Sequence, residues 1–223
     1  MQITEVSVLG VRSAVVVLRN RHTPLRFVLV PTIHMGRPEY YRRIAERIAR
    51  SQLIVAETYD GPSSTGLAYV TAMRLTRQRQ ARGLVHQNID YAALGVPTVW
   101  PDGALLRGRR DRLPLLGWLD LALLVPALTV SMAVGGRAWL LARNLEVSDD
   151  SEVRAPLFNR TMLVERDRLL SADLARVHER RAGEDIEVAV VYGAAHMPAV
   201  VRTLAPLGYR PLRGGDWLTA IPF

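Results

Sequence analysis

Three residues that can bind a metal ion or transfer protons follow short apolar runs of the sequence. His34 and Glu57 come directly after two such runs, and His196 comes shortly after a third. Apolar runs of this length, rich in β-branched residues, are typical of buried parallel strands. The carboxyl ends of parallel strands meet at one edge of a sheet, where ligands bind in open α/β folds. We therefore expect the three side chains to share one site. The runs are residues 27–33, 53–56 and 188–192.

Two imidazoles and one carboxylate form a donor set for a divalent metal ion. The chain has no cysteine, so the ligands must be nitrogen and oxygen atoms. Such an ion polarises a carbonyl and lowers the pKa of bound water. Glu57 could instead act as a general base. Asp102 follows a short predicted strand at Thr98–Trp100, and it could add a ligand or orient a histidine.

Structural interpretations compete with each of these assignments. A histidine after a strand is often a hydrogen-bonded core residue. Glu57 could pair with a buried arginine such as Arg160 or Arg166. Gly193 allows close backbone approach at the second histidine segment. Pro31, at the corresponding position of the first segment, does not allow this and has no N–H.

Local patterns predict the elements around these residues. The segment Ile3–Arg19 reads as a hairpin that turns near Gly10, and Pro38–Arg50 reads as a helix that begins at a proline. With the strand at 53–56, this helix completes a βαβ unit. A second helical stretch is predicted around residues 87–90, ending at Gly95. Two final strands, Gly208–Arg210 and Asp216–Ile221, are expected to be antiparallel.

A long helix is predicted to begin between Ser148 and Pro156 and to end near Arg181. Its apolar positions Leu163, Leu170, Leu174 and Val177 share one face. Polar residues lie on or beside the same face, and they are Asn159, Arg160, Arg166 and Asp167. Buried charges need partners. They could form a structural Arg–Asp pair or contact an anion or substrate, and the sequence leaves both open.

Length and composition favour a single domain spanning residues 1–223. With 49% hydrophobic and 22% charged residues, the chain is globular. The expected fold is α/β, with a mixed, largely parallel central sheet, flanking helices and a helical insertion at about 103–150. The likeness of the two histidine segments suggests pseudo-symmetric halves. All 29 basic residues are arginines, scattered on helix-like segments without a basic, aromatic stripe, so a nucleic-acid partner is not expected.

The segment Leu113–Gly136 is long and apolar enough to span a bilayer. Asp120 interrupts it, and a charge there costs about 2–3 kcal/mol on insertion scales. Packed helices or a homodimer surface are therefore favoured over a span, with a membrane-surface helix as the alternative. The hydrophobic insertion is placed at about 104–146. Because no secretory pattern is present at the N-terminus, a cytoplasmic protein, peripheral to the membrane if the segment anchors it, is expected.

The ordered motifs resemble those of the TraB/TIKI-type domain, a family with two GxxH motifs and a glutamate after the first, and suggest a bacterial protein. Its superfamily includes erythromycin esterases, ChaN-like haem-binding proteins and GumN proteins. The resemblance covers about Arg26 to Tyr209, and Pro31 departs from it by replacing the first motif glycine. The matching residues are Pro31–Gly36, Val55–Glu57, Val164–Asp167, Gly193–Pro198 and Leu207–Tyr209, with weaker matches at Gln87 and Asp102.

The resemblance implies a metal-dependent, peptidase-like hydrolase, because TIKI-type members are metalloproteases. His34, Glu57 and His196 would hold Mn²⁺, Co²⁺ or Zn²⁺, and the substrate would be a peptide or a small ester or amide. Arg166 would stabilise the oxyanion or a substrate carboxylate. Further substrate contacts are assigned to Asn159, Arg160, Asp102 and Gly193.

Two other functions remain open at this point. One is metal-independent, esterase-like hydrolysis with histidine as the base. The other is a non-catalytic regulatory or ligand-binding protein at the membrane surface, of the peptide-signal-shutdown or haem-binding type. Chelation separates the first from the metalloenzyme, and flotation with liposomes tests the second. Resemblance of fold alone does not decide among them.

Overall fold

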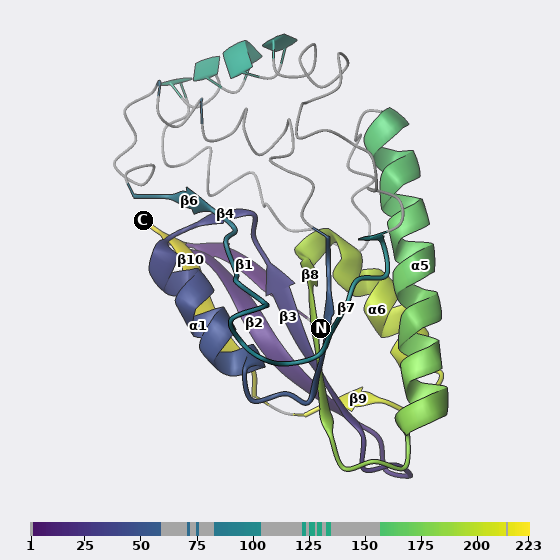
Figure 1. Cartoon of the computed structure of the whole chain (residues 1–223). Coiled ribbons are helices and arrows are strands. Elements are labelled where there is room, and N and C mark those ends of the chain that lie inside the picture. Colours follow the sequence, from purple (N-terminus) through teal and green to yellow (C-terminus); the bar gives the residue numbers. More distant parts are fainter. Residues whose placement is uncertain are drawn as a thin grey trace.

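The computed structural model describes residues 2–58, 71, 75, 83–103, 122–123, 125–127, 129–130, 133–134, 157–212 and 214–223. In the long helix that begins at residue 157, the side chains are described from Leu163 onward. Figure 1 shows the elements in chain order. They are β1 (Thr4–Ser7), β2 (Gly10–Arg19), β3 (Arg26–Thr32), β4 (Met35–Gly36), α1 (Pro38–Ile48), β5 (Leu53–Ala56), β6 (Val85–His86), β7 (Thr98–Val99), α5 (Leu157–Arg181), β8 (Glu187–Gly193), the 3₁₀ helix η2 (Ala194–His196), α6 (Met197–Leu204), β9 (Arg210–Pro211) and β10 (Asp216–Pro222).

One mixed sheet organises the described part of the chain. Its order is β1-β2-β3-β8-β5-β7, and β9 and β10 also pair with β2. Strands β3, β8, β5 and β7 are mutually parallel, whereas β1, β9 and β10 run antiparallel to β2, and β2 runs antiparallel to β3. The predicted mixed α/β class is therefore confirmed. So are the N-terminal hairpin and the helix after β3. The two final strands are present and each runs antiparallel to β2, although the first spans Arg210–Pro211 rather than Gly208–Arg210.

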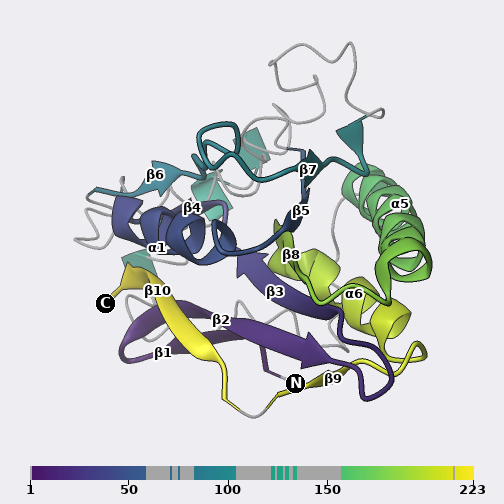
Figure 2. The same ribbon diagram turned by 60° about the horizontal axis from the view of Figure 1, so that its bottom comes forward.

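Helices cover both faces of the parallel strands (Figure 2). Side chains alternate along β3, so that Val28 and Val30 pack with α1 while Phe27 and Leu29 pack with α5 and α6. All four are essentially inaccessible to solvent. Burial on both faces explains why these strands are continuous apolar runs rather than alternating ones. The two helical layers fix the strand ends, from which the candidate site residues project.

Pro31 lies in β3 beyond the last residue that pairs with β2. The pairing of β2 with β3 ends at Leu29, and the Tyr40 hydroxyl, rather than a strand, donates to the carbonyl of Pro31 at 3.0 Å. The hydroxyl groups of Ser13 and Tyr40 are 2.8 Å apart. A residue without an N–H is therefore tolerated here.

The strand register shows that corresponding residues of the two histidine segments do not lie opposite each other. Thr32, not Pro31, lies opposite Gly193. The sequence alignment of Pro31 with Gly193 is thus offset by one residue in space. His34 follows the paired position by two residues, whereas His196 follows it by three. Pseudo-symmetric halves remain a prediction.

The second helical stretch predicted at residues 87–95 is wrong. β6 pairs with β4, residues 87–90 are irregular, and residues 91–95 form a turn. The Asp90 carboxylate accepts the Ala93 N–H at 3.0 Å, which favours a local turn over a continuing helix. Gly95 then adopts a positive φ of 65°, which reverses the chain.

The long helix ends at Arg181 as predicted, and Leu170 and Leu174 are fully buried. The expectation for Leu163 is wrong, because its exposed fraction is 36%. Residues 148–156, where the helix was predicted to begin, lie outside the described residues.

The described positions between 122 and 134 are helical. Most of Leu113–Gly136, and of the predicted insertion at 103–150, lies outside the described residues. Within the described part of the chain, no helix combines the length and apolar character needed to cross a membrane. The packed, dimeric and membrane-surface alternatives for this segment stay predictions.

Candidate active site

The three residues predicted to converge do so at the carboxyl ends of β3, β5 and β8. Glu57 follows β5, and its N–H continues the ladder by donating to the Val191 carbonyl at 2.9 Å. His34 follows β3, and its carbonyl accepts the Gln87 N–H at 2.8 Å. His196 is the last residue of η2, which starts directly after β8. Its Nε2 lies 3.4 Å from Oε1 of Glu57.

Gly193 provides the space in which these side chains meet. A Cβ atom at this position would lie 3.2 Å from Oε2 of Glu57 and 3.3 Å from Nε2 of His34, closer than side chains ordinarily tolerate. The Gly193 N–H donates to Oε2 of Glu57 at 2.6 Å. The close approach that the sequence predicted Gly193 to allow is present. Its backbone, with φ −51° and ψ 143°, is one that other residues also adopt, so the requirement is steric.

Glu57 is a buried carboxylate held ionised by its surroundings. Burial alone would raise its pKa, but His196 and the cation of Arg166, with a smaller contribution from His34, lower the pKa to about 2. Nη1 of Arg166 lies 3.2 Å from Oε1. The predicted pairing of Glu57 with a buried arginine is therefore confirmed for Arg166.

His196 contacts two carboxylates. Its Nδ1 lies 2.6 Å from Oδ1 of Asp167, and its Nε2 faces Glu57. Burial alone would lower the His196 pKa, but the two carboxylates outweigh this and raise the pKa to about 9. The ring of Tyr192 packs edge to face against the imidazole at 5.5 Å. These contacts hold the imidazole between α5 and β5.

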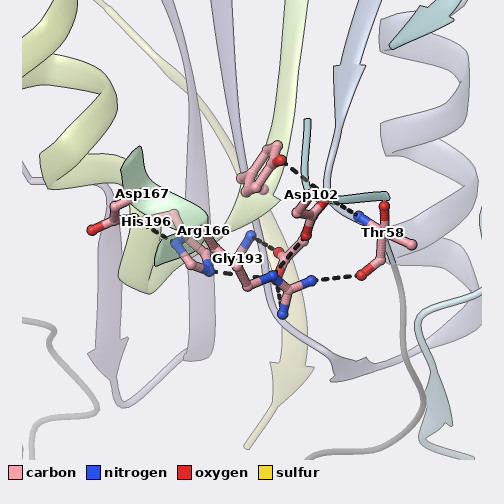
Figure 3. A network of polar contacts seen from close by, with 8 residues as sticks. Thr58, Asp102, Arg166, Asp167, Gly193 and His196 are labelled. Atoms are coloured by element: carbon pink, nitrogen blue, oxygen red, sulfur yellow. Dashed lines mark hydrogen bonds and ion pairs between the residues drawn. The ribbon is translucent and has the colours of Figure 1, made fainter. Parts of the chain in front are cut away.

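Arg166 links the residues that follow β5 with the loop that follows β7 (Figure 3). Besides Glu57, it donates from Nε to Oδ2 of Asp102 and from Nη2 to the Thr58 carbonyl, each at 2.6 Å. Asp102 is fully buried. It also accepts the Thr58 N–H at 3.0 Å and the Tyr192 hydroxyl at 3.4 Å. The sequence predicted that Asp102 adds a metal ligand or orients a histidine, whereas its hydrogen bonds in the structure are with Arg166, Thr58 and Tyr192.

Tyr192 and Tyr91 extend the polar surroundings of Glu57. Burial, followed by the negative charges of Asp102 and Glu57, raises the pKa of Tyr192. Burial, followed by the charge of Glu57, also raises the pKa of Tyr91. The Tyr91 ring packs edge to face on Trp100, with centroids 5.0 Å apart. Both hydroxyl groups therefore stay protonated near neutral pH.

Sequence reasoning left the role of Asp167 open, as part of a structural Arg–Asp pair or as an anion or substrate contact, and did not pair it with His196. Its position beside Arg166 on the same helix face was the available signal, together with the need of a buried histidine for a partner. Asn159 and Arg160 belong to the first turn of α5, and their side chains lie outside the described part. Their predicted substrate contacts stay predictions.

Three further histidines, His22, His86 and His178, stand in loop or helix contexts of the sequence, a pattern that predicts surface residues. His22 is exposed, which confirms the prediction for this residue. His86 and His178 are half-buried instead. Nδ1 of His178 lies 3.0 Å from the Tyr209 hydroxyl, at the far end of α5 from the site. Packing of α5 against the segment after α6 accounts for that burial.

As placed, no set of three His, Asp or Glu residues in the described ranges is arranged to hold a metal ion. What the described geometry supplies is one pair of facing donors, Nε2 of His196 and Oε1 of Glu57, with His34 across Gly193. A facing pair of this kind can stabilise charge or transfer a proton.

Comparisons with known proteins add no further assignment. No family model, no curated protein and no solved structure matches the chain. The TraB/TIKI resemblance therefore stays a prediction.

Proposed function

We propose that this chain is a metal-dependent hydrolase, with peptidase-like chemistry on a peptide or on a small ester or amide. His34, Glu57 and His196 would hold a divalent ion, Mn²⁺, Co²⁺ or Zn²⁺. The observation that carries the proposal is the facing pair of donors at the strand ends, His196 Nε2 and Glu57 Oε1, 3.4 Å apart.

The separation of this pair suits a shared cation. A distance of 3.4 Å is long for a hydrogen bond between charged groups. Two ligands of one tetrahedral zinc ion, each at about 2.1 Å, lie about 3.4 Å apart. The space beside Gly193, where a side chain is absent, brings the second imidazole close, because Nε2 of His34 and Oε2 of Glu57 both lie next to this glycine. The donor set, two imidazole nitrogens and one carboxylate, matches the catalytic sites of many metallohydrolases.

The acidity of Glu57 favours a ligand role over a general-base role. A carboxylate with a pKa of about 2 is a poor proton acceptor near neutral pH. It is fully anionic there, as a metal ligand must be. The ion, when bound, would polarise the substrate carbonyl and acidify water. Arg166 and the Gly193 N–H keep Glu57 in place, and buried Asp102 keeps Arg166 in place.

A metal-independent hydrolase is the second candidate, and specific contacts favour it. Nη1 of Arg166 lies 3.2 Å from Oε1 of Glu57, on the same oxygen that faces His196. A guanidinium at that position repels a second cation. The pKa of about 9 also keeps His196 protonated at neutral pH, suited to stabilise an oxyanion or donate to a leaving group. His34 would then serve as the base.

Elemental analysis of gently purified protein, combined with chelation, separates the two candidates. Hydrolysis of fluorogenic peptides and of p-nitrophenyl esters is measured before and after chelator treatment, and again after addition of Mn²⁺, Co²⁺ or Zn²⁺. The metalloenzyme loses activity on chelation and regains it with metal. The metal-independent enzyme is unaffected.

The variants His34→Ala and His196→Ala should lose activity under either candidate, because each removes a group that the reaction needs. His22→Ala is the matched control, since His22 is exposed and precedes the amino end of β3, whereas the site residues follow the carboxyl ends of β3, β5 and β8. In the metalloenzyme, the two site variants also lose the rise in melting temperature that added metal gives the wild type. Full activity in both site variants would refute the proposed site altogether.

A further inference from the structure

We propose that Asp167 is the positioning residue of the site, which holds His196 so that Nε2 faces Glu57. The inference rests on the proposed function, since it assigns the partner of one proposed ligand. Asp167 contacts the imidazole of His196. It acts through the imidazole.

The contact between the two side chains is short and shielded. Oδ1 of Asp167 lies 2.6 Å from Nδ1 of His196. The exposed fractions of the two side chains are 19% and 5%. A charge-assisted hydrogen bond of this length is among the strong ones, and little solvent competes for it. The bond commits Nδ1 to donate, so Nε2 is the nitrogen left facing Glu57.

The position of Asp167 on α5 makes this contact part of the site rather than an isolated surface pair. Arg166 and Asp167 are neighbours in α5, yet they serve different strand ends. Arg166 reaches Glu57 and Asp102, at the ends of β5 and β7. Asp167 reaches His196, after β8 (Figure 3). One turn of α5 therefore fixes the relative positions of the carboxylate and the imidazole that face each other.

The chemical consequence follows from how histidine binds metals. A metal-ligating histidine almost always donates its other ring N–H to a carboxylate, a backbone carbonyl or water, which fixes the tautomer and makes the ligating nitrogen more basic. Loss of such a partner typically weakens metal binding about 10–100-fold. A purely structural ion pair would instead lower stability and leave the metal affinity of the folded protein unchanged.

The experiment measures the affinity of the full-length, metal-free protein for Mn²⁺, Co²⁺ and Zn²⁺ by calorimetry. Asp167→Ala removes the acceptor, and we expect about 10–100-fold weaker binding. Asp167→Asn keeps an acceptor oxygen without the charge and should fall between Asp167→Ala and the wild type. Asp173→Asn is the matched control, because Asp173 lies on the same helix and is paired with Arg176. Unchanged affinity in Asp167→Ala, with the fold intact by circular dichroism, would overturn the inference.

A proton NMR measurement makes the test independent of metal binding. The Nδ1 proton of His196, held in a short bond to a carboxylate, should give a low-field signal in the metal-free wild type that disappears in Asp167→Ala and stays in Asp173→Asn. If the wild type binds no metal, the proposed metalloenzyme fails, and this signal alone decides the positioning role. Persistence of the signal in Asp167→Ala would overturn it in either case.

Discussion

Replacing Arg166 by methionine removes the cation that two buried carboxylates share. The guanidinium side chain is 12% exposed, and the side chains of Glu57 and Asp102 are 6% and 0% exposed. Methionine has similar length and fits an apolar environment, so the change tests charge more than volume. After the substitution, both carboxylates stay buried with fewer donors.

The expected cost is unequal between the two carboxylates. Glu57 keeps the Gly193 N–H at 2.6 Å and His196. Asp102 loses its shortest partner, at 2.6 Å, and keeps the Thr58 N–H at 3.0 Å. Breaking a buried ion pair by removing one partner costs about 3–5 kcal/mol. We therefore expect a loss of about 3–5 kcal/mol in the free energy of unfolding, mostly from Asp102.

A double-mutant cycle in urea tests this assignment. The second change, Asp102→Asn, removes the buried charge while Oδ1 can still accept the Thr58 N–H. If uncompensated charge is the cause, the double variant is more stable than the sum of the single changes predicts, by about 1–3 kcal/mol. Arg168→Met, on the exposed face of the same helix, is the control and should change stability little. Additive effects within error would refute the reasoning.

Two further predictions concern the pH dependence of stability and the close contacts at Gly193. Because its pKa falls from 4.5 to about 2 on folding, Glu57 stabilises the protein above pH 4.5, and this is lost as pH falls towards 2. The His196 pKa rises from 6.5 to about 9, so its contribution is present below pH 6.5 and is lost as pH rises through 9. Urea unfolding of the metal-free protein, measured across this pH range, should show both losses of stability. His196→Gln should abolish the loss at alkaline pH. If the free energy of unfolding of His196→Gln still falls as pH rises through 9, the assignment to His196 is wrong. Gly193→Ala should slow hydrolysis and weaken metal binding, because the new Cβ displaces Glu57 and His34 by a few tenths of an ångström. Gly183→Ala, with open space around it, should do neither. Wild-type activity in Gly193→Ala would show that the close approach is not needed.

The sequence alone determined which residues could meet and at which edge. Runs of β-branched residues, bounded by a proline-initiated helix, identified the strands that end near His34, Glu57 and His196. This succeeded because burial on both sheet faces makes a parallel strand uniformly apolar, a local pattern that neighbours do not disguise. The turn at residues 91–95 was missed for the opposite reason, since Asp90 and Gly95 determine it through single hydrogen bonds and one positive φ.

Only the tertiary structure decided how the charges pair. Arg166 and Asp167 share a helix face in the sequence pattern, but nothing local shows that one reaches Asp102 and Glu57 while the other reaches His196. Their partners lie on strands brought alongside by sheet order, which places β8 between β3 and β5. The register that puts Thr32 opposite Gly193 is likewise a property of strand pairing. Helix periodicity gives the direction of a side chain, whereas its partner depends on long-range packing that no short window of sequence contains.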